Sequence, residues 1–192
     1  LVLLGDPQQL DQPTPGSHPR GAERSALAHL LEVKGQAVAT MPPERGLFLE
    51  RTWRMHPDIT AFTSEMFYTD ALESEPGNER QWLHGQGLLD GVGVRYLAVT
   101  HGTRDDTSSE DEAAAVVAMV AELLAAAPTW VDRLGDEHDL VQSDILVVAP
   151  YNDHRILIED RLQDRGFPGV RVGSVDKFQG QQAPISIYAM GA

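Results

Sequence analysis

Short apolar runs alternate along this chain with segments whose apolar residues recur at helical spacing. The runs that predict strands are "LVLLGD", "LFLE", "VRYLAV", "DILVVAP", "VRVGSV" and "PISIYAM". Parallel strands need long crossover connections, and these usually fold as helices that pack on the faces of the sheet. The sequence therefore predicts an α/β fold in which helices cover a parallel sheet.

Two helices are predicted in the first third of the chain from their apolar spacing. "SALAHLLEV" places three leucines on one face, which are Leu27, Leu30 and Leu31. Pro57 is a favourable first residue for the next helix. Four residues at i, i+3, i+7 and i+8 spacing form its expected half-buried face, which are Ile59, Phe62, Met66 and Phe67. The segments "PTPGSHPRG" and 69–93 are expected to be irregular.

Two further helices are predicted from their start signals. Ser109 and Glu112 form a capping box for a helix that runs to about Ala127. Asn152 is the expected cap of a helix that ends at Gly166. Each of these helices would cover the parallel sheet.

Composition excludes several classes of protein. No apolar run is long enough to cross a bilayer, and the start lacks both Met and the order of a signal peptide. We therefore expect a piece of a longer cytoplasmic protein with no membrane partner. Without cysteine there is no disulfide or thiolate site, and the seven histidines have no zinc-binding spacing, so no metal site is predicted.

The net charge of −14 argues against a general nucleic-acid binder. The charge is uneven, however, because residues 101–140 hold ten Asp or Glu against two Arg. The cations are thirteen Arg and only two Lys, and the Arg fork suits phosphate. An acidic segment that faces solvent would leave the remaining surface able to bind phosphates.

Polar and aromatic residues follow several predicted strands, where open α/β sheets bind their ligands. After the first run, Gln9 offers an amide to phosphate or water, while Asp6 is more often a turn residue or helix cap. Trp53 and Arg54 follow "LFLE", where the Arg offers forked donors to a phosphate and the Trp a stacking surface. A core Trp beside an Arg paired with a carboxylate is an equally good reading.

Two later blocks have the same position after a strand. In "VDKFQGQQ", Gly180 lets the backbone approach a ligand and the flanking glutamines offer neutral hydrogen bonds. In "VVAPYN", Tyr151 follows the strand, where it would contact a base or fill a gap in packing. Phe178 is expected in the core.

Five blocks in this order resemble the C-terminal half of a superfamily 1B helicase, in the branch of the nonsense-mediated-decay helicase. They are "LVLLGDPQQL", "LERTWRMHPDITAFTSEMFY", "SSEDEAAAVVAMVAELL", "ILVVAPYNDH" and "VGSVDKFQGQQAPISIYAM". The resemblance spans motifs III to V and implies RecA-like, P-loop NTPase-type architecture. It implies a boundary near Met41, with residues 1–40 ending the first lobe and 41–192 forming most of the second. The chain also resembles bacterial proteins that fuse such a helicase to a RecB-like nuclease.

The resemblance implies roles for individual residues. The γ-phosphate of ATP would contact Gln9 and Arg54, with Trp53 stacked on adenine. Gly180 and Gln182 match the nucleotide-contacting residues of motif V. The residues that match nucleic-acid contacts are Pro150, Tyr151, Ser174, Val175 and Asp176.

Three departures from the family pattern bear on these roles. Trp53 replaces the usual Tyr, and Gln182 replaces the usual Glu. The chain also has no phosphate-binding loop or acidic magnesium block, and it stops before the last arginine motif. ATP and Mg²⁺ would therefore bind the full-length parent, with neither held tightly by this piece, which is expected to be inactive alone.

The resemblance favours a fragment of an ATP-dependent helicase that moves 5′ to 3′ on single-stranded DNA or RNA and unwinds duplexes. Its partners would be the nucleic acid, the missing first lobe and a possible fused nuclease. The alternative is a degenerate, non-catalytic lobe that docks a basic partner through its acidic segment. An intact phosphate loop upstream in the gene would favour the motor.

Overall fold

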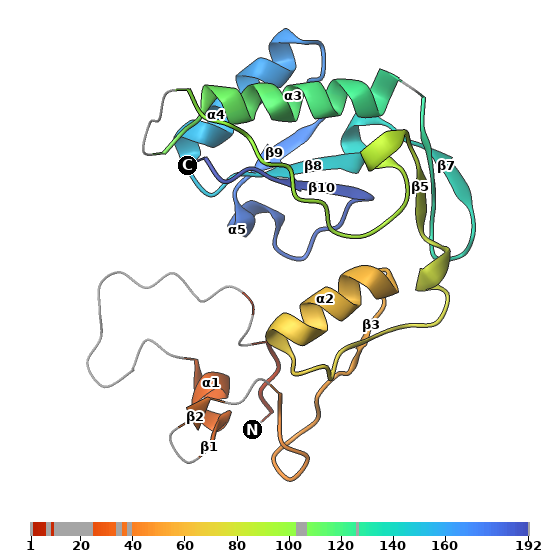
Figure 1. The fold of residues 1–192 in the computed structure, drawn as a ribbon. Coiled ribbons are helices and arrows are strands. Elements are labelled where there is room, and N and C mark those ends of the chain that lie inside the picture. The colour runs from red at the N-terminus through yellow and green to blue at the C-terminus, as the bar shows by residue number, and fades with distance from the viewer. Residues whose placement is uncertain are drawn as a thin grey trace. The chain divides into compact units, whose positions relative to one another are not determined.

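The computed structural model describes residues 2–6, 9, 25–33, 36–37, 40–102, 107–125 and 127–191. It forms two compact units, Leu1–Glu75 and Pro76–Ala192, and each is described here by itself (Figure 1). The expected loop "PTPGSHPRG" lies outside the described residues. The boundary near Met41 refers to lobes of the whole family fold and remains a prediction.

The second unit is built on a three-stranded parallel sheet. Its strands are β8 (Ile145–Val148), β9 (Arg171–Gly173) and β10 (Ile185–Tyr188), in the order β10-β8-β9. Helices α3 (Glu110–Ala125) and α4 (Asn152–Asp164) lie on one side of the sheet and α5 (Val175–Phe178) on the other (Figure 1). The predicted α/β class, a parallel sheet covered by helices, is confirmed.

The core of the second unit lies between the sheet and its two long helices. Apolar residues at helical spacing give α3 a buried stripe of Ala113, Val116, Val117, Val120 and Leu123. Ile158 and Leu162 of α4 and the central strand β8 complete the cluster. Because β8 is covered and has neighbours on both sides, its run "ILVV" is apolar throughout, as buried parallel strands are.

A small antiparallel sheet accompanies the parallel one. It consists of β5 (Trp82–His84), β6 (Thr129–Val131) and β7 (Glu137–Asp139). Single 3-10 turns lie at Asn78–Arg80, Gly87–Leu89 and Gln142–Asp144. The acidic segment thus folds in part as a hairpin, in which Trp130 packs against His138 with ring centroids 4.7 Å apart.

The first unit has shorter elements. Helix α1 (Ala26–Leu30) is followed by the antiparallel pair β1 (Glu32–Val33) and β2 (Gln36–Ala37). Strand β3 (Arg51–Thr52) pairs in parallel with β4 (Glu73–Ser74), and α2 (Pro57–Phe67) connects them. The predicted helices are therefore present, although α1 ends before Leu31, and part of the segment 69–93 pairs as strands.

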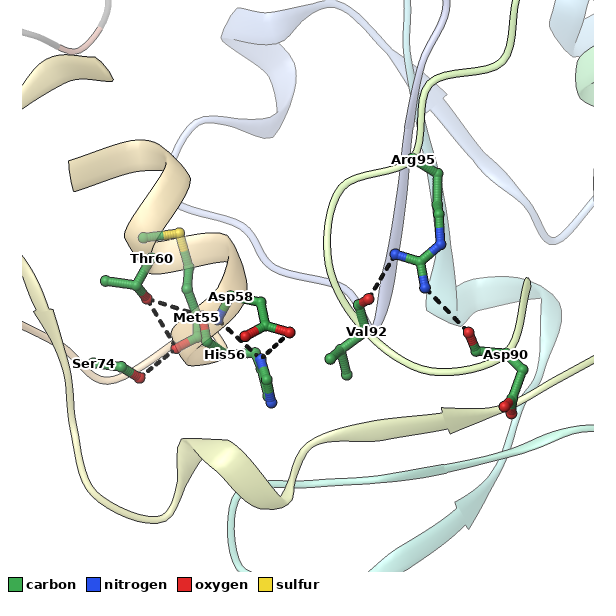
Figure 2. Close-up of polar contacts among 8 residues, drawn as sticks. All are labelled: Met55, His56, Asp58, Thr60, Ser74, Asp90, Val92 and Arg95. Atoms are coloured by element: carbon green, nitrogen blue, oxygen red, sulfur yellow. Dashed lines mark hydrogen bonds and ion pairs between the residues drawn. The ribbon is translucent and has the colours of Figure 1, made fainter. Parts of the chain in front are cut away.

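Three strand predictions are wrong. Residues 2–6, 47–50 and 94–99 form no strand, and Val2 and Leu4 are exposed. A strand needs a neighbour for its main-chain groups, and periodicity alone does not supply one. Arg95 lies in one of these segments, and its guanidinium donates instead to the carbonyls of Asp90 and Val92 in the preceding loop (Figure 2). It also donates to the Leu88 carbonyl.

The predicted face of α2 is also wrong. Phe62, Met66 and Phe67 are exposed, whereas Thr60 and Ser64 are buried. The Thr60 hydroxyl donates to the carbonyls before the helix, and the Ser64 hydroxyl accepts from the amide of residue 72 after it. These local hydrogen bonds turn the polar side of α2 toward the chain on either side of it.

Candidate functional site

The carboxyl ends of β8 and β9 lie next to each other in the second unit. Val148 is in register with Gly173, and the Ala149 amide donates to the Gly173 carbonyl over 3.0 Å. Because parallel strands end on the same side, the residues that follow them share this edge. The structure thereby brings together the predicted nucleic-acid residues, which are Pro150, Tyr151, Ser174, Val175 and Asp176.

Close packing fixes the turn after β9. Ser174 caps α5 by accepting from the Lys177 amide over 3.4 Å, and its hydroxyl retains a proton to donate. A Cβ at Gly173 would lie 2.7 Å from the side chains of Lys177 and Phe178. Lys177 in turn donates from Nζ to the Val172 carbonyl. A larger residue at position 173 would therefore require the side chains of Lys177 and Phe178 to shift.

The turn after β8 presents an aromatic ring. Tyr151 is the N-cap of α4, and Asn152 is the first helical residue, so the predicted cap is displaced by one position. The Tyr151 carbonyl accepts from the Arg155 amide, and its side chain is 42% exposed. The ring is thus anchored by its backbone and accessible at its surface.

Gly180 and Gln182 lie in the loop between α5 and β10. Gly180 has φ +77°, and no atom lies within 4 Å of the Cβ position, so a ligand has room to approach. Arg171, at the start of β9, donates to the Gln181 side chain and to the Gln182 carbonyl. The loop also continues directly from α5, since the Gln179 amide donates to the Asp176 carbonyl and the Gln181 amide donates to the Phe178 carbonyl.

In the first unit, Trp53 and Arg54 lie on the bend between β3 and α2. Both are exposed, the Trp53 side chain by 61%. The bend is held from its far side, since the Met55 carbonyl accepts from the hydroxyls of Ser74 and Thr60 (Figure 2). The exposed pair therefore has a fixed backbone at the entrance to α2.

His56 is the N-cap of that helix. Its Nδ1 accepts from the Asp58 amide over 3.1 Å (Figure 2). Its carbonyl accepts from the amides of Ile59 and Thr60. An accepting Nδ1 places the proton of the neutral ring on Nε2. This geometry gives His56 a structural role as the cap of α2.

Gln9 belongs to a different part of the first unit. Its side chain donates to Asp6 over 3.0 Å, and the same carboxylate accepts from the Tyr68 hydroxyl over 2.5 Å. Burial and then the nearby Asp6 carboxylate raise the pKa of Tyr68 to about 12. Tyr68 follows the end of α2 and Arg54 precedes its start, about 16 Å away along such a helix. Gln9 is thus linked through Asp6 to the residue that follows α2, whereas Arg54 precedes the start of that helix.

Sequence reasoning missed a polar cluster where α3 and α4 begin. His154 is 0% exposed, and its Nε2 lies 3.2 Å from the Glu112 carboxylate. Burial lowers the pKa of His154, and the Glu112 charge opposes that shift. One signal was available, because His154 shares a four-residue spacing with the buried Ile158 and Leu162. A polar side chain on that core-facing stripe indicates a buried partner.

Among the described residues, no helix is long and apolar enough to cross a membrane. In the same part of the chain, no three His, Asp or Glu side chains gather as they would around a metal ion.

Comparison with known proteins gives one matching family, described as an AAA domain, over residues 22–190. The chain is 29% identical to the DNA-binding protein SMUBP-2 of Rattus norvegicus, over 94% of the chain and 18% of that protein. It is 26% identical to the DNA polymerase alpha-associated DNA helicase A of Schizosaccharomyces pombe, over 99% of the chain and 28% of that protein. It is also 28% identical to the 3′-5′ exoribonuclease HELZ2 of Mus musculus, over 95% of the chain and 6% of that protein.

The chain thus spans less than a third of the length of each of these relatives. All three are eukaryotic and give no support to a bacterial origin. The family match covers most of the chain and agrees with the parallel sheet and with the order of the sequence blocks. The chain belongs to the AAA domain family and, within it, to the superfamily 1 helicases.

Proposed function

We propose that this chain supplies nucleotide and single-strand contacts of an ATP-dependent helicase that moves 5′ to 3′ and unwinds duplexes. The observation that carries the proposal is the shared carboxyl edge, where Tyr151 and Ser174 follow neighbouring parallel strands. Family membership supports this proposal, because residues at this edge match positions that contact nucleic acid in the helicase family. We propose this activity for the intact natural protein that contains this chain.

The edge has the chemistry that single-strand binding needs. The exposed Tyr151 ring offers a surface on which a base stacks whatever its identity. The Ser174 hydroxyl and the main chain of Val175 suit phosphate and sugar oxygens, because they donate without adding charge. Asp176 accepts hydrogen bonds and repels phosphate, which assigns it to a sugar hydroxyl or a base amino group. The site thus holds one strand without a basic surface.

The nucleotide contacts are proposed residue by residue from the match to the family motifs. Trp53 provides a stacking surface for adenine, and the Arg54 fork suits the γ-phosphate. Gln9 contributes an amide to the same phosphate or its water. Gly180 and Gln182 contribute a close main-chain approach and a neutral hydrogen bond. Both Trp53 and Arg54 are exposed, which fits contact with a ligand.

Most of the phosphate chemistry lies outside this sequence. The chain has no phosphate-binding loop, so in the proposed motor the missing lobe holds Mg²⁺ and the β- and γ-phosphates. In the proposed motor, the lobe formed by this chain closes over the bound nucleotide. Because ATP contacts both lobes, it binds the closed arrangement better than the open one, and its hydrolysis reverses that preference.

The proposal is tested with the intact protein and fluorescent single-stranded DNA and RNA oligonucleotides. Tyr151→Ala should weaken binding by roughly 5- to 150-fold, since stacking one base is worth about 1–3 kcal/mol. The matched control is Tyr96→Ala, which removes another exposed tyrosine of the same unit and should leave affinity unchanged. Duplexes with a single 5′ or 3′ tail give the direction of unwinding.

If the two variants bind the single strands with equal affinity, Tyr151 does not contact the nucleic acid. An intact protein that neither binds a single strand nor hydrolyses ATP would refute the motor. Binding of basic proteins in that case would support the alternative of a non-catalytic interaction module.

A further inference from the structure

The polar cluster at the start of α3 and α4 has a specific geometry. We infer that Glu112 and His154 are positioning residues, which hold the first turn of α4, and with it Tyr151, against α3 and the chain that leaves β10. The inference rests on the proposed role of Tyr151 in binding a single strand. Neither residue is assigned a contact with the ligand.

Glu112 contacts main chain far from its own helix. Its carboxylate accepts from the Met190 amide over 2.7 Å and from the Gly191 amide over 2.6 Å. The sequence predicts that this side chain returns to the Ser109 amide as half of a capping box. The other half is present, because the Glu112 amide donates to the Ser109 hydroxyl over 3.1 Å. The carboxylate is therefore used to fix the turn after β10.

His154 takes the place that Glu112 leaves. Its Nδ1 lies 3.4 Å from the Ser109 amide nitrogen, which donates to it, and its Nε2 lies 3.2 Å from the Glu112 carboxylate. An accepting Nδ1 places the proton of the neutral ring on Nε2, which lies within ion-pair distance of Glu112 but outside hydrogen-bond geometry. A Cβ at Gly191 would lie 3.1 to 3.3 Å from His154 atoms, so the ring also packs on that glycine. Three segments of the chain thus meet at one buried side chain.

Only a short segment of chain connects His154 to Tyr151 at the edge of the sheet. Tyr151 precedes His154 by three residues, and the turn between them closes with the bond from the Arg155 amide to the Tyr151 carbonyl. A displacement of the His154 ring moves that turn as a unit. The exposed ring of Tyr151 would then shift relative to Ser174 on the neighbouring strand, although neither member of the pair touches a ligand.

The groups around the ring give the cluster a dependence on pH. Glu112 faces it from α3, and His101, whose Nδ1 lies 2.7 Å from the Ser109 hydroxyl, faces it from the segment before α3. Asp153 and Arg155 flank it on α4, where they bond to Thr107 and Glu159 respectively. In the described part of the chain after β10, the groups that bond to Glu112 are the amides of Met190 and Gly191. Protonation would turn Nδ1 into a donor opposite the Ser109 amide and break that contact.

The experiment compares four variants of the intact protein. Glu112→Gln and His154→Leu remove the contacts. His154→Gln is the conservative variant, because an amide accepts at one atom and donates at the other as the neutral ring does. Glu110→Gln is the matched control, since Glu110 also lies in the first turn of α3 but pairs with Arg161 at the surface.

Two readouts separate the structural contact from its effect on binding. Hydrogen exchange at residues 190–191 should accelerate about tenfold or more in Glu112→Gln, the effect of losing a charge-assisted bond, and stay unchanged in Glu110→Gln. With all variants folded, single-strand affinity should fall about fivefold or more in Glu112→Gln and His154→Leu, the lower limit for one stacked base. His154→Gln should keep the wild-type affinity.

Affinity is also measured from about pH 5 to 7.5, a range that extends well below the ordinary imidazole pKa because burial lowers the pKa of His154. Wild-type binding should weaken toward the acid end, and His154→Gln should not. Faster exchange at 190–191 with unchanged affinity would overturn the positioning role, as would unchanged exchange in Glu112→Gln. A wild-type protein that binds no single strand while residues 190–191 stay protected would instead refute the proposed function, and the positioning role with it.

Discussion

Replacing Ile158 by alanine should destabilise the second unit far more than the same change at Ile156, two residues earlier on α4. Ile158 is 0% exposed within the core, whereas Ile156 is 46% exposed. Removing three buried carbons costs about 2.4 kcal/mol at roughly 0.8 kcal/mol each. The cavity left behind raises the expected loss to about 3–4 kcal/mol, within the range for Ile to Ala in cores. At Ile156 about half of the transfer cost, near 1 kcal/mol, is expected and no cavity forms.

The comparison isolates burial, because both variants carry the same change of helix propensity in the same helix. Hydrogen exchange of the β8 amides reports the opening of the second unit without interference from the first. The expected acceleration is roughly 10²- to 10³-fold for Ile158→Ala and about fivefold for Ile156→Ala. Similar acceleration in both variants would show that α4 does not cover the sheet as described, and the packing that places Tyr151 would then be wrong.

Three further outcomes are expected. In the intact protein, Arg54→Ala should lower ATP turnover by about 10³- to 10⁵-fold, as loss of an arginine that stabilises the transferring phosphoryl group does, and near-normal turnover would remove Arg54 from the site. Trp53→Ala should weaken ATP binding in equilibrium titrations, and unchanged affinity would exclude stacking on adenine. Tyr68 has its pKa raised from 10.0 to about 12 in the folded chain, so the folded state holds this proton more tightly. The resulting stability is complete below about pH 10 and is lost as pH rises through 12, which Tyr68→Phe should abolish in alkaline unfolding curves.

The central part of the second unit was predictable from the sequence. The strands at 145–148, 171–173 and 185–188 appear where apolar runs predicted them, and the helices α3 and α4 appear where start signals predicted them. Each of these segments is buried against the others, so local pattern and tertiary packing favour the same structure. The sequence predicted that Tyr151 and Ser174 each follow a strand, but the pairing of β8 with β9, which makes these two residues neighbours, is known only from the structure.

The predictions failed where pattern and packing disagree. "LVLLGD" and "VRYLAV" have strand composition, but the described residues give them no strand neighbour. On α2, spacing favoured an apolar face, while the hydroxyls of Thr60 and Ser64 bonded to nearby main chain and were buried instead. Sequence periodicity reports which side of a helix is apolar. It does not report which side finds a partner.

The sequence by itself determined the fold class, the family and the order of the segments that reach the edge of the sheet, because these depend on periodicity and on residues close together in the chain. Only the tertiary structure decided the partner of Glu112. Local spacing predicted a capping box with Ser109, whereas the folded chain brings the amides of residues 190–191 and the ring of His154 to the carboxylate. Those contacts span more than forty residues, and a buried charge bonds to the donors that surround it in space, whatever their separation in sequence.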